Sequence, residues 1–192
     1  MTKRKWVILA CAAVAFLAIF WTAAARHQTP AGQPPLADLN PQSLKKIKQE
    51  FNTSPHSERV LLLLSPTCPV CVEGSSVVNA VLKQHPGSPV RIFAIWEPIL
   101  PTDWNRPTSA VLHQLSDVRV VQMWDRHHLV AKLIQQSTAG QQPGCCKHNG
   151  TLWDVIAVYP PGAQWTDSLP APEFFAGPVV RGAPHWETKL LE

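Results

Sequence analysis

The stretch RVLLLLSPTCPVC, at residues 59–71, decides the fold. Its apolar run, 60–64, has a polar residue at each end, the pattern of a strand that is buried on both faces of a sheet. The segment 72–84 follows, and its apolar residues recur at helical spacing until a proline and a glycine stop it. Cys68 therefore stands at a strand-to-helix junction, with Cys71 at the start of the helix.

The segments downstream complete an α/β pattern. A second buried strand is predicted at 90–96, and the helix between the two strands makes a βαβ unit. Strands are also predicted at 118–124 and 152–159, with helices near 108–115 and 129–134. This order predicts a central parallel or mixed sheet flanked by helices.

Length and charge limit what the chain can be. The 192 residues and 21.2 kDa allow one globular domain with a short appendage. Lys3, Arg4 and Lys5 account for most of the net charge of +4, because without them 14 of the 17 basic residues face 13 acidic ones. No basic arm for nucleic acid remains.

The amino-terminal segment predicts a membrane anchor. Residues 6–25 are uncharged and apolar over the length that a helix needs to span a bilayer. The basic residues before this run place the amino end in the cytoplasm and the remaining chain in the periplasm or outside the cell. A cleaved signal peptide is the alternative, with a cleavage site at 23–25.

The composition then divides the chain into segments. Residues 1–26 form the anchor or signal, and the proline-rich segment 27–39 is predicted to be a flexible linker. The domain is predicted at 40–170, with Gln164 and Trp165 opening its last, antiparallel strand. A proline-rich extension, 171–192, closes the chain.

The position of Cys68 predicts thiol chemistry. The unpaired amides of the first helical turn stabilise a thiolate, so the pKa of Cys68 is expected to lie below the usual 8.5 or so of a free thiol. Cys71 would resolve a mixed disulfide formed at Cys68. Pro69 supports the helix start, because the first turn does not need its missing amide. A static disulfide or a zinc knuckle is the alternative use of the two cysteines.

Residues 65–71 (SPTCPVC) resemble the motif of membrane-anchored thiol-disulfide proteins of the TlpA, ResA and methylamine-utilisation (MauD) kind. The resemblance implies a thioredoxin-like central mixed sheet flanked by helices, with an N-terminal transmembrane helix, over roughly two thirds of the chain. It also implies that Cys68 attacks and Cys71 resolves. The chain departs from this family before the strand at 152–159, where the family places a cis-proline and residues 150–153 read GTLW.

Cys145 and Cys146 form a candidate second dithiol. They lie in the loop before the 152–159 strand, which predicts that four sulfurs gather at one edge of the sheet. Adjacent cysteines can bond only in a strained ring, so exchange with Cys68 or Cys71 is the relay hypothesis. The competing hypothesis is capture of a soft metal ion such as Cu(I). Its ligands would be Cys68, Cys71, Cys145, Cys146 and His148, with His127 or His128 as further nitrogen donors.

Three functions follow from these motifs. The first is a membrane-tethered extracytoplasmic thiol-disulfide oxidoreductase that acts on protein thiols and disulfides without a cofactor, with Glu97 as candidate proton acceptor for Cys71. The second is a thiolate carrier of a soft metal such as Cu(I). The third is a thioredoxin-like binding module without turnover.

Overall fold

The computed structural model describes residues 26–53, 55–139, 141 and 143–190. Within these ranges no helix is both long and apolar enough to cross a bilayer. The predicted anchor at 6–25 lies outside the described residues.

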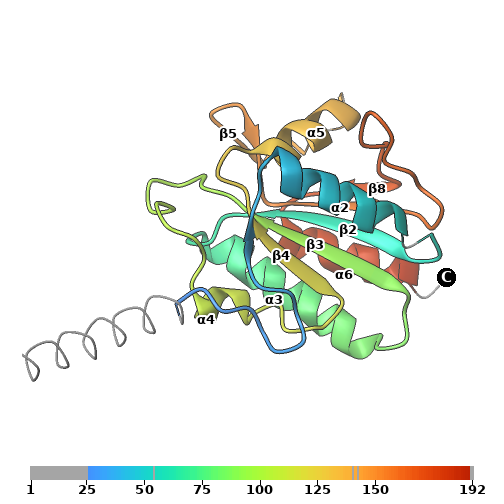
Figure 1. The fold of residues 1–192 in the computed structure, drawn as a ribbon, viewed down its shortest axis with the longest axis horizontal. Coiled ribbons are helices and arrows are strands. Elements are labelled where there is room, and N and C mark those ends of the chain that lie inside the picture. Colours follow the sequence, from blue (N-terminus) through green and yellow to red (C-terminus); the bar gives the residue numbers. More distant parts are fainter. Residues whose placement is uncertain (1–25, 54, 140, 142, 191–192) are drawn as a thin grey trace, which may run out of the picture.

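A six-stranded mixed sheet forms the centre of the molecule (Figure 1). Its order is β1-β4-β3-β2-β7-β8, with β1 to β4 parallel and β7 and β8 antiparallel to their neighbours. This confirms the predicted α/β class with a mixed sheet flanked by helices. The strands are β1 Ala37–Asp38, β2 Glu58–Leu64, β3 Val90–Trp96, β4 Val120–Trp124, β7 Val155–Tyr159 and β8 Phe174–Ala176.

Helices cover both faces of the sheet (Figure 1). Alternate side chains of β2 enter two separate cores, as the all-apolar strand predicts: Leu62 packs with α3 and α6, and Leu61 packs with α2 and α5. Both leucines are buried. The helices are α2 Pro41–Thr53, α3 Pro69–Gln84, α4 Ser109–Leu112, α5 Leu129–Ser137 and α6 Val179–Leu190.

The predicted strand at 152–159 is divided in two. Asp154 has a φ of 49°, a left-handed conformation that interrupts an extended chain. Thr151–Leu152 (β6) before it pairs with Lys147–His148 (β5) as a small hairpin, and β7 starts after it.

The predicted linker and extension both pack on the domain. In segment 27–39, β1 joins the sheet and the Gln33 side chain donates to the carbonyls of Leu115 and Asp117 at 2.7 and 2.8 Å. Segment 171–192 supplies the last strand, β8, and α6, so the prediction that Gln164 and Trp165 open that strand is wrong. The reason lies in tertiary contacts: Trp186 of α6 is fully buried, and Trp165 is buried edge-on against Phe51.

Gly74 allows α3 and α6 to pack closely. A Cβ at Gly74 would lie 2.9 Å from the Val179 Cβ and 3.0 Å from the Val180 nitrogen. We expect Gly74→Ala to lower the free energy of unfolding by about 1–3 kcal/mol, because an added methyl forces the helices apart. Urea unfolding measures this, with Gly87→Ala as control, because nothing lies within 4 Å of a Cβ there. Equal stability of the two variants would contradict the tight contact.

Candidate functional site

The two cysteines of the CPVC motif lie where β2 meets α3. Cys68 is the residue that precedes the helix, with an extended backbone, and Pro69 occupies the first turn as predicted. The side chains of Cys68 and Cys71 are both reduced and buried, with Cys68 6% exposed and Cys71 fully buried. Because parallel strands β2, β3 and β4 end at this edge, the residues that follow each strand meet there.

A buried carboxylate holds the loop that precedes the cysteines. Asp103 accepts hydrogen bonds from the Ser65 hydroxyl at 2.7 Å and from the backbone and hydroxyl of Thr67 at 3.0 and 2.7 Å. It also accepts from the backbone amides of Ile99 and Leu100. Burial raises the pKa of Asp103, but these hydrogen bonds outweigh it and the pKa is lowered. The carboxylate therefore fixes Thr67, and with it the position of Cys68.

Cys68 has the properties of a reactive thiolate. The hydrogen bond from the Cys71 side chain is the largest cause that lowers the pKa of Cys68 to about 6. Burial opposes this shift, while the backbone N–H groups of Cys71 and Val70 support it. Amides of the helix start thus contribute to the lowered pKa of Cys68, after the larger effect of the Cys71 side chain.

Cys71 lies between Cys68 and a buried acid, Asp154. The hydrogen bond with Cys68 is the largest cause that raises the pKa of Cys71, and burial and the charge of Asp154 add to it. Asp154 is 5% exposed, and its interaction with the Cys71 side chain lowers the pKa of Asp154. Burial raises the pKa of Asp154 despite its bonds to Cys71 and to the Val179 amide, which lies 3.0 Å from Oδ1.

Sequence reasoning missed Asp154. The residue stands directly before β7 and directly after residues 150–153, where the resemblance implies a cis-proline, and that departure was the available signal. The described chain instead has a cis peptide bond at Gly177-Pro178, between β8 and α6. This bond precedes Val179, whose amide binds Asp154.

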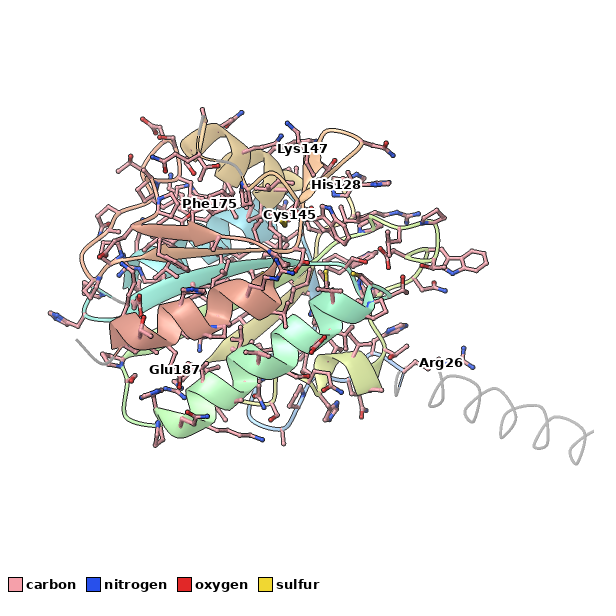
Figure 2. The ribbon with its side chains drawn as sticks, turned by 180° about the vertical axis from the view of Figure 1, so that it is seen from behind. Arg26, His128, Cys145, Lys147, Phe175 and Glu187 are labelled. Atoms are coloured by element: carbon pink, nitrogen blue, oxygen red, sulfur yellow. A yellow bond between two sulfur atoms is a disulfide. The ribbon has the colours of Figure 1, made fainter. Side chains whose placement is uncertain are left out.

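Cys145 and Cys146 form a disulfide with each other. Figure 2 shows Cys145 at the same end of the molecule as Lys147 and His128. Cys145 is exposed, whereas Cys146 is 2% exposed and packs in the core on the α2 and α5 side. Cys68 and Cys71 belong to the core on the other side of the sheet.

The four sulfurs therefore do not share one core. Cys146 lies in a different core from Cys68 and Cys71, and no group of three or more His, Cys, Asp or Glu residues suited to a metal is found in the described part of the chain. In the proposed metal set, His148 lies in β5 and hydrogen-bonds Asn149 at 3.2 Å.

Glu97 pairs with His128. Glu97 is fully buried after β3, and its Oε2 lies 2.8 Å from the His128 Nδ1, while its Oε1 has no hydrogen-bond partner. Burial raises the pKa of Glu97 to about 7, against the favourable contact with His128. The Glu97 hydrogen bond is also the largest cause that raises the pKa of His128. The acid that contacts Cys71 is Asp154, and Glu97 as its proton acceptor stays a prediction.

Apolar side chains are exposed beside the dithiol. Val70, inside the CPVC motif, is 41% exposed, and Trp104, next to Asp103, is 83% exposed. Trp96 and Trp124, two further tryptophans at strand ends, are buried in the core. Of these three tryptophans, Trp104 presents the most surface.

The topology agrees with the architecture that the motif implies. Strands β4, β3 and β2 run parallel, β7 and β8 follow antiparallel, and the dithiol opens the helix after β2. The fold is thioredoxin-like. No protein-family model and no curated protein sequence matches the chain.

Three solved structures are similar to the chain. A thioredoxin-like protein in its oxidised form has 11% identity and a TM-score of 0.45, over 71% of this chain and 78% of that protein. A secreted Mycobacterium tuberculosis disulfide oxidoreductase, homologous to E. coli DsbE, has 11% identity and a TM-score of 0.41, over 71% and 81%. The thioredoxin domain of a Bacteroides vulgatus thiol-disulfide oxidoreductase has 10% identity and a TM-score of 0.40, over 71% and 83%.

The Glu97–His128 pair predicts a pH-dependent stability. Folding raises the pKa of both groups, and that of Glu97 reaches about 7. The usual pKa of glutamate is about 4.3. Between these two pH values the folded state therefore binds more protons than the unfolded state. The free energy of unfolding should therefore fall as the pH rises through this range.

We expect the stability of the wild type relative to Glu97→Gln to fall by about 1–3 kcal/mol between pH 4 and about pH 8. Urea unfolding at several pH values measures the difference. Parallel curves for the two proteins would show that Glu97 does not titrate in this range.

Proposed function

We propose that this protein is a thiol-disulfide oxidoreductase that uses the Cys68–Cys71 dithiol. One observation carries the proposal: Cys68 precedes a helix, its pKa is lowered to about 6 by the Cys71 thiol and by backbone amides, and Cys71 is buried behind it. A static structural pair needs no such difference between its two sulfurs. The names of the similar solved structures agree with this chemistry.

The reaction follows from the order of the two sulfurs. The Cys68 thiolate attacks a substrate disulfide, forms a mixed disulfide and releases one substrate thiolate. Cys71 then loses its proton and attacks the Cys68 sulfur. This step forms the Cys68–Cys71 disulfide and releases the second substrate thiolate, so the substrate gains two electrons from the dithiol. The reverse sequence oxidises a substrate dithiol.

Asp154 is the proposed proton acceptor for Cys71. Once Cys68 is in a mixed disulfide, its sulfur is no longer a thiolate that can accept the proton of Cys71. The Asp154 carboxylate is then the acceptor that remains beside Cys71. Burial raises the pKa of Asp154, which makes it a stronger base than an exposed aspartate. The proton held by Asp154 can then pass to the departing substrate thiolate.

Protein thiols and disulfides are the proposed substrates. Val70 and Trp104 expose apolar surface on two sides of the loop that Asp103 holds, which suits a polypeptide more than a small charged thiol. We also propose that residues 6–25 tether the domain to the cytoplasmic membrane with the dithiol in the periplasm or outside the cell. The apolar run and the preceding Lys3-Arg4-Lys5 support this orientation.

The reactivity of Cys68 provides the first test. We expect its alkylation by iodoacetamide to follow a titration with a midpoint near the pKa of about 6. Cys71→Ala should raise the midpoint toward about 8.5, because the main stabilising hydrogen bond is lost. Cys68→Ser should abolish reduction of a fluorogenic glutathione disulfide. Full activity in Cys68→Ser would overturn the proposed function.

The resolving step tests Asp154 against Glu97. We expect Asp154→Asn to slow release of glutathione from the Cys68 mixed disulfide by about 100-fold, because the carboxylate that takes the Cys71 proton is gone. Stopped-flow single turnovers at several pH values measure this rate, and Asp154→Glu should restore part of it. Glu97→Gln is the matched control, since Glu97 binds His128. A slow Glu97→Gln beside a normal Asp154→Asn would assign the proton to Glu97.

A further inference from the structure

We propose that the Cys145–Cys146 disulfide is a second redox centre, which external dithiols reduce and which controls the resolving step at Cys71. The second centre stands independently of the function proposed above, whereas its control of Cys71 rests on that function.

The disulfide is open to attack on one side. Cys145 is exposed in the loop, whereas Cys146 is 2% exposed and packs against apolar side chains. Exposed Lys147 is adjacent in sequence and adds positive charge near the point of attack (Figure 2). An anionic thiolate is therefore attracted to the Cys145 sulfur, the one that solvent reaches.

The exchange balances with an external dithiol as reductant. Its thiolate bonds to the Cys145 sulfur and breaks the Cys145–Cys146 bond, and Cys146 leaves as a thiolate that takes up a proton. The second thiol of the reductant then attacks the mixed disulfide and releases Cys145. The protein gains two electrons and two protons, and the reductant leaves as its own disulfide.

Cys146 lies beside the backbone that carries Asp154. A Cβ at Gly177 would lie 2.6 Å from the Cys146 Sγ and 2.8 Å from the Asp154 carbonyl oxygen. Both atoms therefore lie close to the Gly177 backbone. The Trp153 amide also donates to the Cys146 carbonyl at 3.1 Å. Cys146 is therefore linked to Asp154 through the hydrogen-bonded backbone of Trp153, and both residues lie against Gly177.

Reduction of the disulfide changes this arrangement. The two sulfurs lose their covalent bond and separate to van der Waals contact, and Gly177 leaves no free volume beside Cys146. Exposed Cys145 can turn into solvent, whereas a shift of buried Cys146 acts on the Trp153 backbone that bonds to it and leads to Asp154. Because the Asp154 side chain contacts Cys71, reduction at Cys145–Cys146 displaces the acid that the resolving cysteine uses.

Residue-resolved alkylation tests the second centre in the full chain. Trypsin gives one peptide, 133–147, with Cys145 and Cys146 and another, 60–83, with Cys68 and Cys71. During titration with dithiothreitol under native conditions, peptide 133–147 should change from unmodified to carrying two alkyl groups. The change should also occur in the C68S/C71S variant, which cannot perform the proposed function. A peptide that is alkylated without reductant, or only after unfolding in urea, overturns the second centre.

Single turnovers test the control of Cys71. Cys145→Ser and C145S/C146S both break the bond, and the single variant keeps the buried Cys146. We expect either to slow release of glutathione from the Cys68 mixed disulfide by about fivefold or more, without changing the alkylation rate of Cys68. Gly144→Ala is the control in the same loop, because a Cβ there meets nothing within 4 Å.

The outcomes separate the two proposals. Normal release in both serine variants overturns the control of Cys71. If the wild type itself releases no glutathione, the proposed function fails, while the titration of peptide 133–147 still decides the second centre. A folded Cys145→Ser chain, checked by circular dichroism, is sufficient for the comparison.

Discussion

The burial of β2 on both faces determines where the chemistry occurs. A strand with apolar side chains in both directions is stable only at the centre of the sheet, between β3 and β7. Its carboxyl end therefore opens onto the middle of one edge of the sheet, and α3 begins there with Cys68. The Cys71 side chain and the amides that lower the pKa of Cys68 both belong to this helix start, so the environment of the thiol is a consequence of core packing.

Local sequence patterns predicted the elements that carry the dithiol. The all-apolar runs of β2 and β3, the helical spacing of α3 and the CPVC motif are contained within single segments. Segments 27–39 and 171–192 have no comparable pattern, because their order depends on contacts with distant residues. Gln33 bonds to carbonyls after α4, and Trp186 fills a core built by α3 and the sheet.

The candidate site also combines residues that a local sequence pattern predicted with residues that depend on contacts between distant segments. A cysteine at a helix start predicted a lowered pKa of Cys68, whereas the largest cause of that shift is the hydrogen bond from the Cys71 side chain; Pro69 lies in the first turn, where the sequence placed it. Asp154 was not predicted, because it reaches Cys71 only through a left-handed turn before β7 and the amide of Val179 in α6. Glu97 was predicted as a proton acceptor for Cys71; it is buried after β3 and its partner is His128, a contact that sequence spacing does not reveal.

The position of Val179 also concerns the order in which the chain is made. The CPVC motif is synthesised well before β8 and α6, yet Asp154 is held by an amide of α6 and lies beside Gly177. A nascent chain therefore carries both cysteines of the motif while the acid beside Cys71 still lacks its anchor. The dithiol reaches its final environment only when the last helix docks, so the proposed resolving step has its acid in place only after the domain has folded.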